Sequence, residues 1–341
     1  MFEHGGKLRA ASQQFGIPLS DWVDLSTGIA PIPYPMPELP VSVWQRLPEE
    51  EDGLLDAARD YYGAKNLLPV NGSQAAIMAL PRLRAAGTVA VLFPGYGEYA
   101  PAWAAAGHGV IECTADEVLQ KNADVILLAN PNNPDGQVFS REALLAAAER
   151  QAQRQGWLVV DEAFADVDSD HSLAAVAGTG AAKNVIVLRS LGKFFGLAGA
   201  RVGFCIAAKD ILNRLQDLLG PWPLANPARF AAKAGLGDTA WQINQRAYLC
   251  QASARLAALL RQYGLAPKGG TALFQYVPFH QGSEGLAALY TQFAQRGILV
   301  RHFTQPAALR FGLPDGEVAW TRLEAALRGA KMEKTRDGKN S

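Results

Sequence analysis

The amino-acid sequence predicts an α/β protein with two lobes: a large one, in which a mainly parallel sheet lies between helices, and a smaller α+β one. Its 341 residues are more than one ordinary core accommodates. From about residue 44 to 220, short runs that are apolar throughout alternate with helical patterns, which is typical of parallel sheets covered on both faces. The pattern then changes to a long helical stretch followed by short strands and helices.

The runs expected as strands of the large lobe are TVAVLF, ADVILLA, GWLVVDEA, NVIVLRS and RVGFCIA, and its clearest helices are ALPRLRAA, REALLAAAERQAQRQ and ILNRLQDLLG. A long helical stretch should run from about Ala228 to Tyr263. The small lobe should then form a strand, a helix, two short strands and a last helix, from ALFQYV, GLAALYTQFAQR, GILVR, ALRFGL and EVAWTRLEAALR.

We expect four segments along the chain. Residues 1–40 should form an N-terminal arm that joins the small lobe, 41–222 the large domain, 223–330 the small domain and 331–341 a flexible polar tail. In the arm, the five prolines between residues 31 and 40 favour an extended chain over a helix.

The charge composition excludes some classes of partner. Lys and Arg number 32, as do Asp and Glu, so the net charge is zero and no field favours nucleic acid or an anionic membrane. The N-terminus lacks the apolar stretch of a signal peptide, and no run approaches the ~18 apolar residues of a spanning helix. Cys113, Cys205 and Cys250 have no CxxC spacing, which favours reduced thiols. A cytoplasmic protein without nucleic-acid or membrane partners is therefore expected.

Two residues at expected strand ends suit pyridoxal-5′-phosphate (PLP) chemistry. Lys193, in the loop of VIVLRSLGKFFGLAGARVGF, could form a Schiff base with the cofactor. Asp161 ends the strand GWLVVD and could hold the proton on the pyridine nitrogen, so that the ring acts as an electron sink. Each has a simpler interpretation when taken alone: a lysine on a surface loop, and a helix cap.

Other residues could hold the cofactor's phosphate. In NGSQAAIMAL, a turn opens a helix at Gly72, Ser73 and Gln74, and the N–H groups of a helix N-terminus attract anions. Ser190 precedes the lysine by three residues and Arg201 follows it by eight, so both could reach the same phosphate. A plain serine cap is the alternative for the turn.

Three further side chains complete such a site. Tyr96 could stack on the ring, with Tyr99 as the competing choice. Asn133, in ANPNNPDG, could donate to the phenolic oxygen of PLP. Arg310, in ALRFGL, is an arginine among apolar neighbours and could bind a substrate carboxylate. The alternative for the tyrosine is an aromatic residue of the core. For Asn133 it is an ordinary turn, and for Arg310 it is a structural salt bridge.

The order of these motifs resembles the class I and II aminotransferase superfamily over about residues 20–325. The resemblance implies PLP fold type I, with a seven-stranded sheet in the large lobe. It also implies a homodimer with active sites near the interface.

Within that superfamily the chain resembles the L-threonine-O-3-phosphate decarboxylases of cobalamin biosynthesis most, and the histidinol-phosphate aminotransferases next. EHGGKLRAAS followed by VDLSTGIAP is similar to the opening of the decarboxylases, which implies that His4, Gly5 and Gly28 contact substrate. Phe164, in DEAF, also resembles this family, since aminotransferases of the fold generally carry a tyrosine there.

The same resemblance implies that Arg301 binds the substrate phosphate and that Arg310, with Asn133, binds its carboxylate. Two departures from the pattern affect the details of phosphate anchoring and arm contacts. Leu47 stands where relatives often have a tyrosine from the partner subunit, and Ala30 stands where they usually have asparagine.

The implied activity is that of a carboxy-lyase that converts L-threonine O-3-phosphate into (R)-1-amino-2-propanol O-2-phosphate, with Lys193 returning a proton to Cα. A PLP-dependent aminotransferase of the histidinol-phosphate type is the alternative. A non-enzymatic scaffold is a more distant one, because it would have no reason to keep both Lys193 and Asp161.

Overall fold

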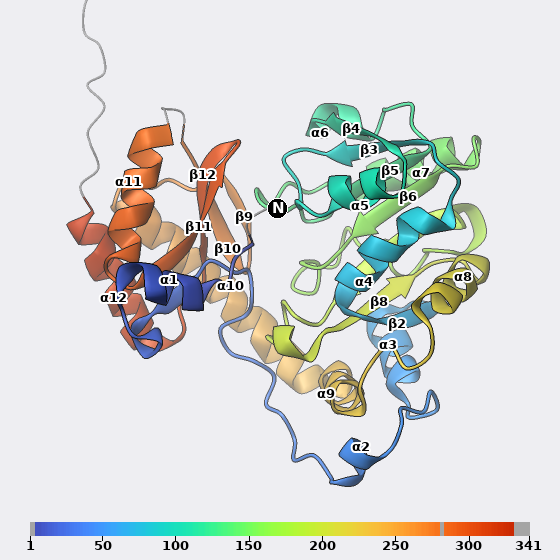
Figure 1. Cartoon of the computed structure of the whole chain (residues 1–341), viewed down its shortest axis with the longest axis horizontal. Helices are drawn as coiled ribbons and strands as arrows, with labels where there is room; N and C mark the ends of the chain where they lie inside the picture. The colour runs from blue at the N-terminus through green and yellow to red at the C-terminus, as the bar shows by residue number, and fades with distance from the viewer. Residues whose placement is uncertain (1–3, 280–282, 331–341) are drawn as a thin grey trace, which may run out of the picture. The chain divides into compact units, whose positions relative to one another are not determined.

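The computed structural model describes residues 4–279 and 283–330, which form two compact units along the chain. The large unit comprises residues 32–250, and the small unit comprises the described residues of 3–31 and 251–341. Figure 1 colours the chain by residue number, so the N-terminal part of the small unit is dark blue and its C-terminal part is orange to red.

The large unit contains the seven-stranded, mostly parallel sheet that the resemblance implied. The strand order is β2-β8-β7-β6-β5-β3-β4, and only β8 runs antiparallel to its two neighbours. The strands are β2 (Leu67–Asn71), β3 (Thr88–Leu92), β4 (Gly109–Cys113), β5 (Val125–Ala129), β6 (Trp157–Asp161), β7 (Val185–Ser190) and β8 (Val202–Ile206).

The five apolar runs of the sequence are confirmed as β3, β5, β6, β7 and β8. All residues of β5 to β8 are buried, so each run is apolar on both faces because both faces are covered. The edge strands β2 and β4 were not among the predicted runs. In β4 only Cys113 is buried, and β2 contains Pro69, which is tolerated on an edge strand because one side of its backbone has no partner strand.

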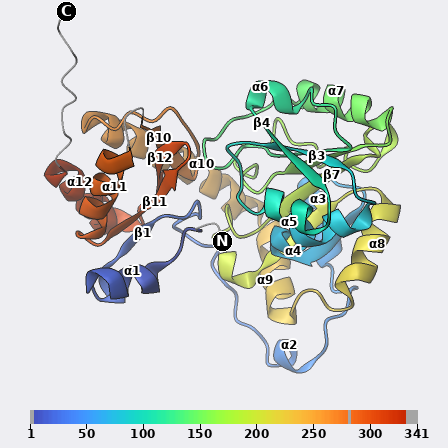
Figure 2. The same ribbon diagram turned by 45° about the horizontal axis from the view of Figure 1, so that its top comes forward.

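Nine helices begin in the large unit, and several cover the sheet (Figures 1 and 2). Those named α4, α5 and α8 share one hydrophobic core with alternate residues of the strands, among them Val89, Val125 and Val159. Helix α7 contacts β6. The helices are α2 (Ser42–Gln45), α3 (Leu54–Tyr62), α4 (Gly72–Ala79), α5 (Tyr99–Ala105), α6 (Ala115–Val118), α7 (Arg141–Ala152), α8 (Lys209–Leu219), α9 (Asn226–Gly237) and α10 (Thr239–Gln262).

Some helical expectations need correction. ALPRLRAA is not an α-helix: it continues α4 as the 3-10 helix η2 (Leu80–Leu83), because Pro81 cannot supply the N–H of a regular turn. The expected stretch from Ala228 to Tyr263 is divided at Asp238, whose carboxylate accepts from the Trp241 N–H (2.9 Å) and so starts α10. The other 3-10 helices are η1 (Leu19–Asp21), η3 (Gly180–Ala182) and η4 (Ala198–Ala200).

The contacts divide the chain inside α10, near residue 250, whereas the change of sequence pattern suggested a domain boundary at residue 222. The difference has a structural cause. Helix α9 packs against α2, α3 and β8, all in the large unit, although its sequence resembles the helices that follow.

The small unit is built on a five-stranded sheet in the order β1-β11-β12-β10-β9. Strand β1 comes from the N-terminal segment and pairs in parallel with β11, so the start of the chain is part of this unit. Its strands and helices are β1 (Val23–Leu25), β9 (Gly269–Thr271), β10 (Phe274–Pro278), β11 (Ile298–Thr304), β12 (Ala307–Gly312), α1 (Leu8–Phe15), α11 (Ser283–Ala294) and α12 (Gly316–Gly329). The tail expected at 331–341 lies outside the described residues. In the described part of the chain, no helix has the length and apolar character needed to cross a membrane.

Candidate active site

A pocket of about 120 Å³ lies where the parallel strands of the large unit end. Its lining includes every residue that the sequence predicted for the cofactor except Gly72: Ser73, Gln74, Tyr96, Asn133, Asp161, Ser190, Lys193 and Arg201. Larger hollows occur elsewhere in this unit, of about 390 Å³ beside α2 and α9 and about 910 Å³ at the amino ends of the strands. Neither contains a predicted site residue, so we place the candidate site in the smaller pocket.

Asp161, the last residue of β6, is a buried carboxylate with two hydrogen bonds. It is 5% exposed, and its oxygens accept from the Tyr99 hydroxyl (2.8 Å) and from the Ala163 N–H (3.0 Å). Burial raises its pKa above the ordinary value, while these two donors and the nearby Lys193 act in the opposite direction. A carboxylate in such an environment is well suited to pair with a cationic ring nitrogen.

Lys193 lies in the same pocket, in a loop that packs against aromatic side chains and accepts hydrogen bonds. The Nζ atom is 5.4 Å from the centroid of the Phe164 ring. Phe194 and Phe195, which follow the lysine, are buried, and Phe195 stacks on Trp241 at 5.7 Å between centroids. The backbone carbonyls of this loop also accept hydrogen bonds, from the Tyr34 N–H to Phe195 and from the Gln245 side chain to Phe194.

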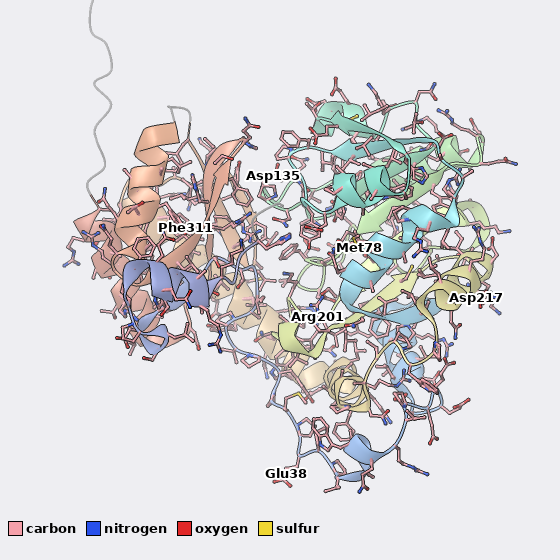
Figure 3. The ribbon with its side chains drawn as sticks, viewed as in Figure 1. Glu38, Met78, Asp135, Arg201, Asp217 and Phe311 are labelled. Carbon is pink, nitrogen blue, oxygen red and sulfur yellow. The ribbon has the colours of Figure 1, made fainter. Side chains whose placement is uncertain are left out.

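The predicted phosphate turn opens helix α4, and two glycines bring its first N–H groups close to β8. Gly72 has a φ of +67°, which favours glycine, and a Cβ there would lie 2.5 Å from an Arg201 nitrogen. At Gly203, a Cβ would lie 2.5 Å from the backbone nitrogen of Ser73, so only glycine fits. Arg201, which is labelled in Figure 3, has a left-handed backbone conformation; its φ is 54°. The start of the helix, Ser190 and Arg201 therefore lie together at one pocket, and that they bind a phosphate stays a prediction.

The two tyrosines that competed for the stacking position have different partners. Tyr96 donates to the Gln74 side chain (3.0 Å), whereas the buried Tyr99 donates to Asp161. Their rings meet edge to face with centroids 5.3 Å apart. The sequence analysis did not predict that Tyr99 contacts Asp161. Its only sign was the three-residue spacing of Tyr96 and Tyr99, which allows both side chains to face the same pocket.

These groups fit PLP. A buried carboxylate can face the ring nitrogen, a lysine amine can bond to the aldehyde carbon, and a helix N-terminus with an arginine can hold the phosphate. Asn133 lines the same pocket, as predicted for a donor to the phenolic oxygen.

Tyr99→Phe is expected to lower kcat/KM by about tenfold, because an outer hydrogen bond that orients an essential group typically has an effect of this size. Removing the donor also raises the pKa of Asp161 further. Asp161 then takes up its proton at a higher pH, so the acid limb of the pH–rate profile should move to higher pH. Tyr96→Phe is the matched control, because that hydroxyl binds Gln74 instead of Asp161. An unmoved acid limb in Tyr99→Phe would contradict the expectation.

In the small unit, Arg301 and Arg310 are directly opposite each other on the antiparallel strands β11 and β12. Arg310 is 6% exposed; its guanidinium lies 4.7 Å from the Phe274 ring centroid and donates to the Ser26 carbonyl (3.1 Å). Burial, and secondarily the charge of Arg301, lower the pKa of Arg310 to about 9. The two side chains therefore form a concentrated positive site on this sheet.

The N-terminal turn packs on the segment that carries Ser26. The Gly6 N–H donates to the Ser26 hydroxyl (2.8 Å), and a Cβ at Gly5 would lie 2.3 Å from the Ser26 carbonyl oxygen. His4 and Gly28 belong to the same unit. Because Ser26 also accepts from Arg310, this turn and the arginine are joined through one residue. That His4, Gly5 and Gly28 contact substrate stays a prediction.

The two departures from the family pattern differ in environment. Leu47 is 65% exposed, in the segment between α2 and α3, and Ala30 is buried. Leu47 borders the hollow beside α2 and α9.

Comparison with known proteins supports one family. A model of the aminotransferase class I and II family matches residues 50–335. The chain is 52% identical to a threonine-phosphate decarboxylase of Pseudomonas aeruginosa, over 97% of this chain and 98% of that protein. It is 40% identical to a threonine-phosphate decarboxylase of a Sinorhizobium species, over the same shares of the two chains.

Among solved structures, the fold is similar to histidinol-phosphate aminotransferase from Sinorhizobium meliloti in complex with pyridoxal-5′-phosphate. The TM-score is 0.80, with 21% identity over 96% of this chain and 97% of the other. At that identity the likeness concerns the fold.

Proposed function

The chain belongs to the class I and II aminotransferase family, and on that premise we propose that it is a PLP-dependent threonine-phosphate decarboxylase. It converts L-threonine O-3-phosphate into (R)-1-amino-2-propanol O-2-phosphate and CO₂, a step of cobalamin biosynthesis. The observation that carries the proposal is the 52% identity to a threonine-phosphate decarboxylase along nearly the whole of both chains.

When bound, PLP supplies an electron sink for the electron pair released at the substrate's Cα. The residues of the pocket bind and orient the cofactor. Asp161 would hold the proton on the ring nitrogen, and Lys193 would hold the cofactor through its aldehyde carbon. The N–H groups of Gly72 to Gln74, with Ser190 and Arg201, bind the phosphate.

Lys193 would also act as a proton donor to the substrate. In its ammonium form, Lys193 would be the acid that gives a proton to Cα and becomes a neutral amine, which would complete a decarboxylation. Delivery of that proton to the cofactor carbon instead would give transamination. Phe164 supports decarboxylation over transamination. The decarboxylase family resembles this chain in having phenylalanine at this position, where aminotransferases of the fold generally have tyrosine.

The substrate's two anionic groups require two cationic sites. We assign the carboxylate to Arg310, with Asn133, and the phosphate to Arg301. We also propose that the substrate is contacted by His4, Gly5 and Gly28. We also propose that the molecule acts as a homodimer, which the family resemblance implies, and that it acts in the cytoplasm, which the sparse cysteines and the N-terminal sequence favour. Light scattering and cell fractionation test the two features.

The experiment supplies PLP-loaded protein with L-threonine O-3-phosphate and no 2-oxo acid, and follows CO₂ and the amine product. Catalytic CO₂ release is expected. A parallel reaction contains L-histidinol phosphate and 2-oxoglutarate. Transfer of amino groups in that reaction, without CO₂ release in the first, would replace the proposal by the aminotransferase alternative.

A further inference from the structure

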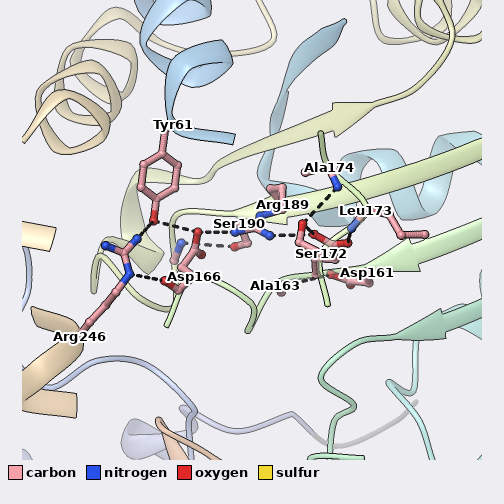
Figure 4. Close-up of polar contacts among 12 residues, drawn as sticks. Tyr61, Asp161, Ala163, Asp166, Ser172, Leu173, Ala174, Arg189, Ser190 and Arg246 are labelled. Carbon is pink, nitrogen blue, oxygen red and sulfur yellow. Dashed lines mark hydrogen bonds and ion pairs between the residues drawn. The ribbon is translucent and has the colours of Figure 1, made fainter. Parts of the chain in front are cut away.

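A buried network of charged side chains lies next to the candidate site in the large unit (Figure 4). The guanidinium of Arg189 donates to two carboxylates at once, to Glu162 at 2.8 Å and to Asp166 at 2.5 Å. All three side chains are at most 3% exposed. Glu162 accepts further hydrogen bonds from the Ser172 hydroxyl (2.5 Å) and from the Leu173 N–H (2.7 Å).

This network is attached to the ends of the two strands that carry Asp161 and Ser190. Glu162 follows Asp161 directly, and Arg189 directly precedes Ser190. Successive side chains of a strand point to opposite faces of the sheet. The ion pair of Glu162 and Arg189 therefore joins the carboxyl ends of β6 and β7 on one face, while Asp161 and Ser190 line the pocket on the other.

The network also reaches the loop of the lysine. The backbone carbonyl of Asp166 accepts from Arg246 (2.9 Å), and its carboxylate accepts from the Tyr61 hydroxyl (3.1 Å). The guanidinium of Arg246 lies 5.2 Å from the ring centroid of Phe194, the residue that follows Lys193. Three segments that supply pocket residues are thus connected through Arg189 and Asp166.

Stability alone gives no reason for burying so many charges. The desolvation of an ion pair offsets most of its attraction, so apolar side chains of similar volume would stabilise a core at least as well. Burial by itself would lower the pKa of Arg189, yet Asp166 and Glu162 raise it above the ordinary value, so the arginine stays cationic. The rigid guanidinium of Arg189 binds both carboxylates at once, and it thereby fixes the ends of β6 and β7 relative to each other.

We propose that Arg189 is a positioning residue for the cofactor site, which acts by bridging Glu162 and Asp166 and so holds Asp161 and Ser190 in place. The inference rests on the proposed binding of PLP by this pocket, and it assigns to Arg189 no contact with the cofactor. Lysine cannot replace it, because a single ammonium group lacks the planar fork that reaches two carboxylates.

The test compares wild type and Arg189→Lys by titration of the apoprotein with PLP and by the visible circular dichroism of the bound cofactor at saturation. We expect the dissociation constant of PLP to rise roughly 10- to 100-fold, as for other side chains that orient direct ligands. The dichroic band at saturation should weaken, since it reports a fixed ring orientation that a purely stabilising role would not affect. Absence of PLP binding in the wild type would instead refute the proposed function.

The matched control is Gln151→Leu. The side chain of Gln151 is buried and donates to the carbonyls of Ala123 (3.1 Å) and Trp157 (3.5 Å), so it supports the same sheet at the amino end of β6. The control should lower the melting temperature and leave PLP affinity and the dichroic band unchanged. Equal losses in both variants, or wild-type affinity and dichroism in Arg189→Lys, would overturn the inference.

If Arg189→Lys does not fold, the same measurements are made on Ser172→Ala. It removes the hydroxyl that donates to Glu162 and accepts from the Ala174 N–H, and leaves Arg189 itself in place. The same changes are expected at a smaller size, and wild-type behaviour in this variant would count against the positioning role.

Discussion

Lys193→Ala is expected to lower kcat for CO₂ release from L-threonine O-3-phosphate by at least about 10³-fold, because the variant lacks both the covalent attachment of the cofactor and the acid that protonates Cα. Borohydride reduction followed by peptide mass spectrometry checks the attachment independently of activity. The cofactor should be fixed to the peptide that contains residue 193 in the wild type, and to no peptide in the variant.

Lys183→Ala is the control for this loss. Lys183 is an exposed lysine in the segment before β7, and its replacement should leave both the rate and the labelled peptide as in the wild type. Cofactor fixed to another lysine, or CO₂ release that persists in Lys193→Ala, would contradict the assignment of the catalytic lysine.

Much of the cofactor pocket could be predicted from the sequence because its residues lie at strand ends. Parallel strands place their carboxyl ends at one edge of the sheet, so Asp161, Ser190 and the loop of Asn133 converge regardless of the distances between them along the chain. The inner strands could be recognised for a related reason. A strand buried on both faces is apolar along most of its length, and this leaves a clear pattern.

The parts that escaped prediction depend on contacts between distant residues. Tyr99 and Asp161 are 62 positions apart, and no local pattern indicates that a tyrosine near the stacking residue will donate to that carboxylate. Arg189 and Glu162 were visible only as neighbours of pocket residues, and their pairing follows from the register of β6 and β7. Strand β4 escaped for a different reason, since a half-exposed edge strand needs no continuous apolar run.

Arg310→Met is expected to separate activity from stability. The loss of a buried charged partner for the substrate carboxylate should lower kcat/KM by about 10²- to 10³-fold, which corresponds to about 3–4 kcal/mol. The melting temperature of the ligand-free protein should stay the same or rise. Arg310 is buried beside Phe274 and faces a second cation, Arg301, so burial and like-charge repulsion both disfavour its charge in the fold, and methionine removes both costs.

The pH dependence of the wild type follows from the same arginine. Its pKa falls from its ordinary value to about 9 in the fold, so the charge that binds the carboxylate is present below about pH 9 and is lost above it. KM should therefore rise as the pH passes through 9. Between these two pKa values the unfolded chain binds more protons than the folded one, so the unfavourable contribution of Arg310 to stability fades as the pH increases.

Arg255→Met is the matched control for Arg310→Met in the same unit. Arg255 is about half exposed and forms an ion pair with Glu317, a type of contact that contributes at most about 1 kcal/mol. This variant should keep its activity, and its melting temperature should fall slightly. Both expectations are the reverse of those for Arg310→Met. If Arg310→Met instead lost activity and stability together, the arginine would be a structural element of the small sheet and the carboxylate would need another partner. The opposite signs expected for the two variants follow from burial, because Arg310 is removed from solvent whereas Arg255 is about half exposed.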